Sequence, residues 1–484
     1  MRGTGNQGRF FAVTLALAWA VAAACPAPAR AAGEDAARAA LRLRCDEAME
    51  SAVRTSFGWG WTAADAAAEL EAAPDDGKKG PARRAKAPDP LIDAAPTAAI
   101  GVQLLWAGEL LHEDKYRQAA REAARALAAI QNPTGQVRAR GLLGKAGGPK
   151  EALIEVPDRA ATRAALALWL ALLDTDAEAN ARAAGKAPDA GAAAAPAPAR
   201  APARDERLTR PAAAAAHWLA RQQTPAGAWA LLYPPDAPRG KGTRLVRLDD
   251  PDYRDTALAL LLAGDGLGDA HLKFVFDRSL SALISCRVAT GRDPQPTLWQ
   301  AAYALDGMPQ QKFADLPQGT DLLASRRAME VLLCAHLIGG NEAASSALSE
   351  AAEALAALPK KGGVWSRHYD RRGRPIDAAK PSTRTAGFFE APVAPEINVP
   401  LGIDPVLAGA QQIRRGDEQA LRQSLEQRLS LRHRVGAMLC GVSGQLFDVD
   451  AQAGDAQLGQ VALESERVQK LWLALRKLAG SRKS

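Results

Sequence analysis

The sequence predicts an all-α protein in which repeated helical hairpins stack into an α/α toroid. Of the 484 residues, 48% are hydrophobic but only 5% are aromatic, and alanine, the strongest helix former, is abundant. Apolar residues recur at three- and four-residue spacing, and no convincing run alternates as a strand would. An internal repeat divides the helical region into units of about 65–70 residues, which suffices for one inner and one outer helix.

The first 31 residues have the three parts of a signal peptide. Two arginines give a positive start, residues 10–24 are apolar but too short for a stable membrane span, and Ala29-Arg30-Ala31 fits a cleavage site. We therefore expect residues 1–31 to be removed on export to the periplasm or beyond, and no transmembrane segment in the mature chain. An uncleaved anchor is one alternative. A lipoprotein attached at Cys25 is another, disfavoured because Ala22-Ala23-Ala24, directly before the cysteine, contains no leucine.

The predicted helices lie between segments that lack helical periodicity. They cover residues 104–131, 161–174, 212–223, 257–265, 279–287, 324–339 and 348–358. Two segments without a packed face, 72–95 and 184–206, are predicted to be flexible insertions within a toroid that spans 40–376. The Pro-rich residues 377–404 are predicted to form an extended loop. Residues 405–484 contain amphipathic stretches, so we expect a helical C-terminal extension.

The repeat consists of a helix end followed by a turn. Its four copies are Leu127–Gly135, Leu219–Gly227, Leu283–Gly291 and Leu355–Gly363. Trp229 and Trp365 each follow the first leucine of their copy by ten positions. Because stacked repeats need such positions to pack and turn, these leucines, glycines and tryptophans are expected to be structural.

Composition and motifs exclude several classes of function. The five cysteines, of which Cys25 lies in the signal peptide, have neither CxxC nor zinc-like spacing. The net charge of +7 is small for so long a chain, so no nucleic-acid partner is expected. No nucleotide-binding or serine-hydrolase motif occurs in a suitable context. His217 and His336 lie in apolar helices and are expected to be satisfied core residues.

Several blocks of the chain, in order over about residues 45–380, resemble the pectate lyases of polysaccharide lyase family ten. The repeat AAAAAHWLARQQTPAGAWALLYP at 212–234 is similar to a toroid repeat of that family. Four further blocks resemble other motifs of the family. They are Asp252-Tyr253-Arg254-Asp255, LWQAAY at 298–303, VWSRHYD at 364–370 and Arg374-Pro375-Ile376. The resemblance implies β-eliminative cleavage of polygalacturonate or a related acidic polysaccharide.

The same resemblance implies a set of site residues and calcium as a cofactor. A lyase must neutralise the uronate carboxylate and the negative charge that develops beside it, and calcium and cationic side chains do this. Asp252 and Asp255 would bind calcium, and Arg367 and Lys380 would be catalytic, with Arg384 as another candidate base. The substrate would be bound by Arg254, Trp299, Tyr303, Tyr369 and Arg374.

Each candidate also has an ordinary structural interpretation. The aspartates at 252 and 255 fit a helix start, Arg367 fits a structural ion pair, and Trp299 and Tyr303 fit the core. The basic loop with Lys241, Arg244 and Arg247 fits a solvated surface as well as a polyanion site.

The chain departs from the family where chemistry is concentrated. Thr256-Ala257-Leu258 replaces the acidic pair that follows the DYRD motif, and Ala304 stands where a carboxylate would follow the LWQAAY block. The catalytic arginine of the family has no clear counterpart. A second function is therefore kept open, namely a non-catalytic toroid that binds a glycan or another protein.

Overall fold

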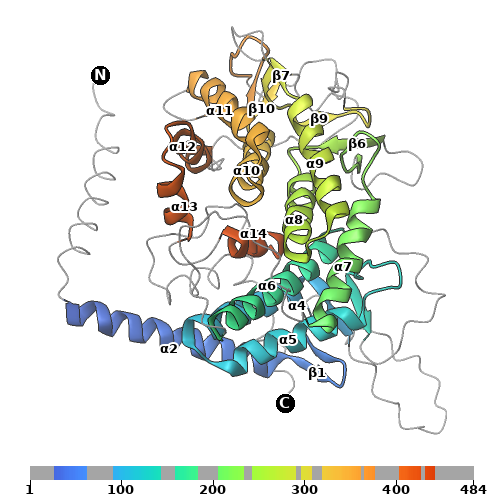
Figure 1. The fold of residues 1–484 in the computed structure, drawn as a ribbon, viewed down its shortest axis with the longest axis vertical. Helices are drawn as coiled ribbons and strands as arrows, with labels where there is room; N and C mark the ends of the chain where they lie inside the picture. Colours follow the sequence, from blue (N-terminus) through green and yellow to red (C-terminus); the bar gives the residue numbers. More distant parts are fainter. Residues whose placement is uncertain are drawn as a thin grey trace, which may run out of the picture.

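The computed structural model describes residues 27–62, 91–142, 159–183, 205–233, 243–289, 296–307, 319–360, 365–376, 403–426 and 431–441. The fold of these residues is the α/α toroid that the sequence predicts (Figure 1). The described residues form four helical hairpins that follow one another around an arc. Each hairpin pairs one inner helix with one outer helix, as the repeat length requires.

The inner layer consists of α4 (Ala94–Leu111), α6 (Arg159–Ala183), α8 (Pro251–Leu267) and α10 (Leu322–Gly339). Successive inner helices pack side by side, and protein surrounds them on all faces. In α8, for example, every residue from Asp252 to Gly264 is buried. Helices that are apolar on all sides are those that a protein core encloses, which explains why these segments show little polar periodicity.

The outer layer consists of α5 (Asp114–Ala129), α7 (Glu206–Arg221), α9 (Ala270–Ser285) and α11 (Glu342–Ala357). Each packs against the inner helix that precedes it in the chain. The inward faces of α5, α7 and α11 are rich in alanine, which lets these helices approach their neighbours closely, while their outward faces are polar. The inward face of α9 carries larger apolar side chains. Three of the outer helices begin at side-chain caps, because Asp205, Asp269 and Asn341 each accept a hydrogen bond from a backbone N–H of the first turn.

Three helices follow the last hairpin, as predicted for the C-terminal segment. They are α12 (Ile403–Arg414), α13 (Glu418–Glu426) and α14 (Leu431–Leu439). The helix α12 packs on α10 and α11 at one edge of the arc, and α2 (Ala27–Ser51) packs on α4 at the other. By contrast, α14 contacts α6 and α8 and also reaches α4 and α10, so it lies inside the arc (Figure 1). Residues 442–484 lie outside the described part.

The repeated turns confirm two copies of the sequence repeat. Gln131 donates from Nε2 to the carbonyl of Gly135, and Gln223 does the same to Gly227. Each glutamine also reaches the next outer helix. Both glycines have positive φ, 97° and 87°. A Cβ atom at Gly135 would lie 2.1 Å from the carbonyl oxygen of Ala214. Only glycine therefore fits this close approach.

The structure adds short antiparallel strands that sequence analysis did not predict. The pairs are β1 (Val53–Thr55) with β2 (Gly58–Gly60), β3 (Leu91–Asp93) with β4 (Arg140–Leu142), β5 (Leu231–Tyr233) with β6 (Thr243–Arg247), β6 with β9 (Ala302–Tyr303), β7 (Val288–Ala289) with β8 (Pro296–Leu298), and β10 (Thr320–Asp321) with β11 (His368–Tyr369). Strands of two to five residues are too short to show the alternation by which a strand is recognised.

Some predicted segment boundaries shift in the structure. Residues 91–95 were assigned to an insertion, but they form β3 and the start of α4. Asp205 and Glu206, assigned to the second insertion, cap and begin α7. The remainder of both insertions and nearly all of 377–404 lie outside the described residues, and α12 already begins at Ile403. The helix α2 begins at Ala27 and so includes the predicted cleavage site.

One described helix, α4, is long and apolar enough to cross a membrane by length and composition alone. However, 78% of its 18 residues are buried inside the fold. It packs against α5 and α6 as the core helix of the first hairpin.

If α14 fills the interior of the arc, a charge on its inner face will destabilise the whole fold. Val435 is fully buried, so Val435→Asp should lower the free energy of unfolding by about 3–5 kcal/mol because it leaves an unpaired charge in the core. Chemical denaturation monitored by circular dichroism measures this loss. Gln419→Asp on the exposed face of α13 is the control, expected within about 0.5 kcal/mol of wild type. Equal stability of the two variants would contradict this position of α14.

Candidate functional site

The charged side chains of the inner helices gather at the N-terminal end of the toroid, where α6, α8 and α10 begin. Ion pairs link the first turns of α6 and α8 to each other, join α8 to the third turn of α10, and connect the loops around β6, β10 and β11. Buried charges must be paired because removing an ion from water is costly. The pairing therefore fixes how the helices and loops meet at this end.

The first group of charges joins α6 to α8. The carboxylate of Asp252 lies 2.7 Å from Nη2 of Arg159 and also forms a close ion pair with Nη1 of Arg163. Although burial acts to raise it, the guanidinium groups of Arg163 and Arg159 hold the pKa of Asp252 below its usual value. Nη1 of Arg163 also donates to the hydroxyl of Thr256 at 2.8 Å. The N-cap role expected of this loop belongs to Asp250, whose carboxylate accepts from the backbone N–H of Asp252.

The second group joins α8 to α10 in the core. Nε of Arg254 lies 2.8 Å from Oδ1 of Asp255, and its Nη1 lies 2.8 Å from Oε2 of Glu330. Glu330 is fully buried and Arg254 is 3% exposed. Although burial opposes the charged form, Glu330 and Asp255 raise the pKa of Arg254. This arginine, expected to bind substrate, has at least two donors committed to ion pairs inside the protein.

The third group surrounds two loop carboxylates. Arg247 makes a bidentate pair with Asp249, with both N–O distances 2.6 Å. Arg367 bridges the two acids, with Nη2 3.3 Å from Asp249 and Nε 3.2 Å from Asp321. Nδ1 of His368 lies 3.2 Å from the same oxygen of Asp321. The predicted Arg367 thus lies among charged side chains from two loops and from the N-cap of α10.

Arg327, in the second turn of α10, differs from every arginine described above. Its Nε and Nη1 are enclosed by protein, yet no described residue accepts a hydrogen bond from them. Burial, followed by the nearby charges of Arg254 and Arg326, lowers the pKa of Arg327 to about 10. The guanidinium still carries its charge at neutral pH. It therefore offers donors to an anion at the point where the other charges are already paired.

The aromatic candidates belong to the core. Trp299 and Tyr369 are fully buried and Tyr303 is 1% exposed, so none offers a ring face on which a sugar could stack. The indole N–H of Trp299 donates to the carbonyl of Leu283 at the end of α9, just as Trp229 caps Leu219 at the end of α7. Burying an indole requires a partner for its N–H, and the helix end supplies one.

The two tyrosines have matching structural roles. The hydroxyl of Tyr303 accepts from the backbone N–H of Gln300, and that of Tyr369 accepts from Ser366. Each tyrosine therefore closes a turn at the same place in its repeat, three residues after the donor. The core interpretation of these rings fits the geometry, and their sugar-stacking role finds no support in it.

The remaining predicted residues lie elsewhere. Arg374 is exposed and pairs with Asp370 across the turn after β11. Lys380, Arg384 and Lys241 lie outside the described residues, and Arg244 is exposed on β6. His217 is not a core residue as expected. It lies at the surface of α7, where its Nε2 is 3.0 Å from the carboxylate of Asp269. Asp269 is the N-cap of α9, so the histidine contacts the start of the next outer helix.

The described residues do not fit a calcium site. Calcium takes six to eight oxygen ligands, usually from several carboxylates. Asp252 is held by Arg159 and Arg163, and Asp255 by Arg254. No group of three or more His, Cys, Asp or Glu side chains among the described residues could hold a metal ion. A cation would have to displace these guanidinium groups before it could bind.

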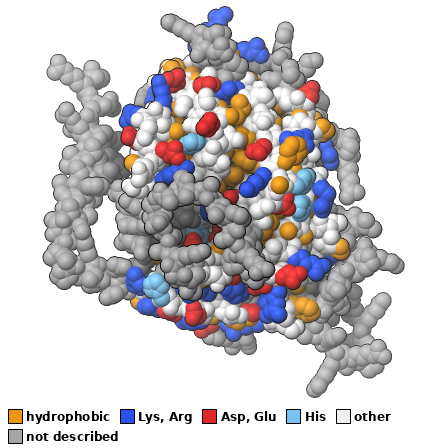
Figure 2. All heavy atoms as spheres, viewed as in Figure 1, with side chains coloured by type: hydrophobic (Ala, Val, Ile, Leu, Met, Phe, Trp, Pro, Cys, Tyr) orange, Lys and Arg blue, Asp and Glu red, His pale blue; other side chains and the backbone are white. Residues whose placement is uncertain are grey.

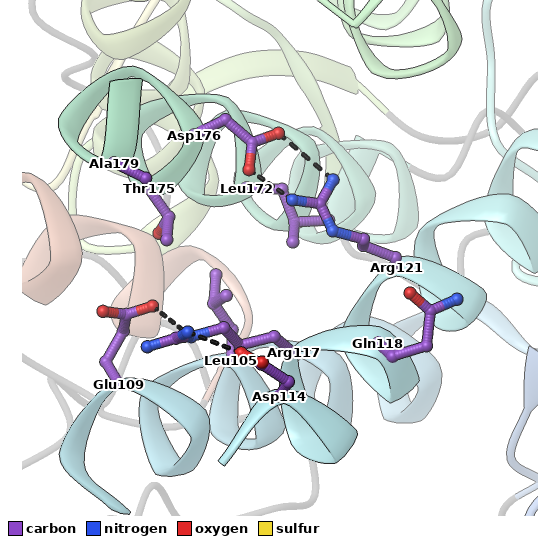
Figure 3. Close-up of a pocket in the computed structure, with 10 residues that line it drawn as sticks. All are labelled: Leu105, Glu109, Asp114, Arg117, Gln118, Arg121, Leu172, Thr175, Asp176 and Ala179. Carbon is purple, nitrogen blue, oxygen red and sulfur yellow. Dashed lines mark hydrogen bonds and ion pairs between the residues drawn. The ribbon is translucent and has the colours of Figure 1, made fainter. Parts of the chain in front are cut away.

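A separate cavity of about 350 Å³ lies between α4, α5 and α6, towards the C-terminal ends of the inner helices. Figure 3 shows that its two arginines already have carboxylate partners. Arg117 pairs with Glu109 and Asp114, and Arg121 forms a two-bonded pair with Asp176. Because Arg117 and Arg121 are already paired, the guanidinium groups that line this cavity are less suited to an acidic ligand than that of Arg327. On the surface, acidic and basic side chains are interspersed over the face in Figure 2.

Comparisons with known proteins find distant similarity to solved structures. No family model and no curated protein matches the sequence. A mutant family 10 polysaccharide lyase from Cellvibrio cellulosa, solved with trigalacturonic acid, is 13% identical with a TM-score of 0.33, over 57% of this chain and 85% of the other. An unsaturated glucuronyl hydrolase specific for heparin is 12% identical with a TM-score of 0.35, over 81% and 87%. A D-mannose isomerase is 12% identical with a TM-score of 0.27, over 70% and 91%. These likenesses concern the fold alone.

Sequence reasoning missed several residues of this end. They are Arg159, Arg163, Asp249, Asp321, Arg326, Arg327 and Glu330. One signal was available, because Arg326-Arg327 and Glu330 interrupt an otherwise apolar helix. A charge within a segment that is buried on all faces indicates a partner or a ligand.

The ion pair between Arg254 and Glu330 should be important for stability. Glu330→Gln leaves a buried arginine with only one of its two acidic partners, which should lower the free energy of unfolding by about 3 kcal/mol. Glu350→Gln is the matched control, because Glu350 forms a pair with Arg287 while its side chain is 49% exposed. That control should cost at most about 1 kcal/mol. Denaturant titration of both variants measures the difference, and equal losses would contradict the buried pairing.

Proposed function

We propose that this protein binds an acidic polysaccharide at the N-terminal end of α8 and α10 and cleaves it by β-elimination. The observation that carries the proposal is Arg327. Its enclosed Nε and Nη1 donors have no hydrogen-bond partner among the described residues, whereas the neighbouring Asp249 and Asp321 are held by Arg247 and Arg367. A uronate carboxylate would supply the missing acceptor and would match the planar fork of the guanidinium.

The electrostatics of this end favour an anion. Burial and two neighbouring arginines depress the pKa of Arg327, so an added negative charge would relieve an unfavourable environment. Asp249 and Asp321, the nearby loop acids, are neutralised by Arg247 and Arg367. The N-terminal ends of α8 and α10 add positive partial charge. Together these groups would favour a carboxylate over a neutral sugar.

The proposed reaction depends on the same electrostatics. The proton alpha to a uronate carboxylate is weakly acidic while that carboxylate keeps its full charge. A guanidinium held against the carboxylate stabilises the negative charge that develops when the proton leaves. No step of this proposal uses calcium, because the described carboxylates do not form a site for it.

A non-catalytic glycan-binding toroid is the second candidate. The pairing of Asp252, Asp255 and Glu330 favours it, because these acids stabilise the fold and are not free to act on a substrate. The two candidates predict the same binding and differ only in whether an unsaturated product forms.

Binding tests the part that the candidates share. Isothermal titration with oligogalacturonides should show that Arg327→Gln weakens binding at least about tenfold, since a charge-assisted hydrogen bond is lost. Arg372→Gln, on the exposed turn after β11, should leave the affinity unchanged. Neutral oligosaccharides of equal length should bind neither protein measurably. Equal affinity of wild type and Arg327→Gln would overturn the assignment of this site.

We also propose that the chain is exported and that its signal peptide is cleaved after Ala31. The three-part pattern of residues 1–31 supports this proposal. Sequencing the N-terminus of protein recovered from the periplasm or medium should give Ala32 as the first residue. Ala31→Asp should block processing, because the cleavage site requires a small residue there. Full-length protein retained in the cytoplasm, or lipid attached to Cys25, would contradict cleavage at this position.

A further inference from the structure

His368 lies in β11, directly opposite Asp321 of β10 in the register of that strand pair. Its Nδ1 lies 3.2 Å from Oδ2 of Asp321, which is itself 1% exposed. Asp321 is held in place from two further sides. Its Oδ1 accepts from the backbone N–H of Ala324 at 2.7 Å, and its Oδ2 accepts from Nε of Arg367. The imidazole is therefore oriented by a carboxylate that has little freedom to move.

This contact determines which ring nitrogen of His368 is free. A carboxylate only accepts hydrogen bonds, so Nδ1 carries the proton and Nε2 carries the lone pair. Burial lowers the pKa of His368, and the opposing effect of Asp321 does not restore it. No described residue gives Nε2 a hydrogen bond, and Nε2 is not among the enclosed atoms that lack a partner. A neutral ring with an available acceptor is the form in which histidine acts as a base.

His368 shares its surroundings with Arg327. Asp249 acts electrostatically on both residues, and Arg327 lies less than two helical turns after Asp321. The other described histidines have different places. His112 is the C-cap of α4, and His217 and His271 stack on one another between α7 and α9 at the surface. His336 pairs with Glu418 of α13, and His433 lies on α14. Among the described residues, His368 is thus the base that lies with the proposed carboxylate-binding arginine.

Building on the proposed function, we propose that Nε2 of His368, held by Asp321, is the general base that removes the proton alpha to the uronate carboxylate bound by Arg327. The C5–H proton moves to Nε2, and the electron pair of that bond forms the C4=C5 double bond. The C4–O4 bond breaks and its electrons leave with O4, which takes a proton from water. The imidazolium then loses its proton to water, so the base is restored and no other reagent is consumed.

The test compares His368→Gln with wild type in rate, binding and pH dependence. The turnover of an acidic polysaccharide, followed by the absorbance of the unsaturated uronate, should fall at least about a hundredfold. The affinity for oligogalacturonide should stay near wild type, unlike that of Arg327→Gln. His271→Gln, exposed on α9, is the control and should keep the wild-type rate.

The pH dependence gives a readout that a structural role would not produce. The wild-type rate should rise with pH as the imidazole loses its proton, with a midpoint below the usual histidine pKa of about 6.5. This acidic limb should be absent from whatever rate remains in His368→Gln. If that variant does not fold, a wild-type profile without this limb overturns the proposal, and ¹⁵N NMR of the wild-type ring must show a neutral Nδ1–H tautomer.

The failure of the base and the failure of the function are distinguishable. If the wild-type protein binds oligogalacturonide but forms no unsaturated product, the proposed lyase activity and the proposed base are both wrong, and the proposed binding site stands. If the wild-type protein is active and His368→Gln keeps both the rate and the acidic limb of the pH profile, only the assignment of His368 as the base is wrong.

Discussion

The inner helices are enclosed by protein on every side, so each charged group in their first turns needs a partner inside the fold. The pair between Arg254 and Glu330 joins α8 to α10, and Asp252 joins α6 to α8 through two arginines. Breaking such a pair leaves a desolvated charge, which costs far more than the loss of a surface ion pair. The positions of the helices at this end, and of the loops that carry Asp249 and Arg367, depend on this pairing.

The opposite end of the toroid is neutralised in a different way. Asp265 lies in the last turn of α8, where a carboxylate meets the negative end of the helix dipole, and Asp174 lies in the second half of α6. Arg432, at the start of α14, pairs with both. The far end of α14 reaches α6 near its beginning, since the thiol of Cys440 contacts the carbonyl of Ala164. The helix therefore runs antiparallel to α6 through the interior of the arc.

The sequence predicts the hairpins because their packing is visible in its periodicity. The alanine-rich segment 212–223 became most of α7, and the turns at Gln131 and Gln223 share one hydrogen-bond pattern. It does not show which charges meet, because Arg163 and Asp252 are 89 residues apart. The short α14 has a weak amphipathic pattern, which is why its place inside the arc could not be inferred.

The resemblance to pectate lyases singled out residues that the fold brings together at the N-terminal ends of the inner helices, but it did not single out Arg327. Asp252, Arg254 and Arg367 all lie there, and each has a charged partner, whereas Arg327 has no ion pair or hydrogen bond to Nε or Nη1 among the described residues. Trp299 and Tyr369 match family motifs because the repeat needs them to close helix ends and turns. A pattern of residue types thus located the charged end, and only the three-dimensional contacts separate structural charges from available ones.

The central claim is that this end of the toroid cleaves an acidic glycan with arginine in place of a metal ion. The most direct measurement is the ultraviolet absorbance of unsaturated uronate product formed by the purified mature protein on a panel of acidic polysaccharides. Parallel reactions contain calcium or a chelator. The account predicts a rise on at least one substrate, at the same rate in both conditions. A flat trace across the panel from folded protein, or a rise that requires calcium, would contradict it.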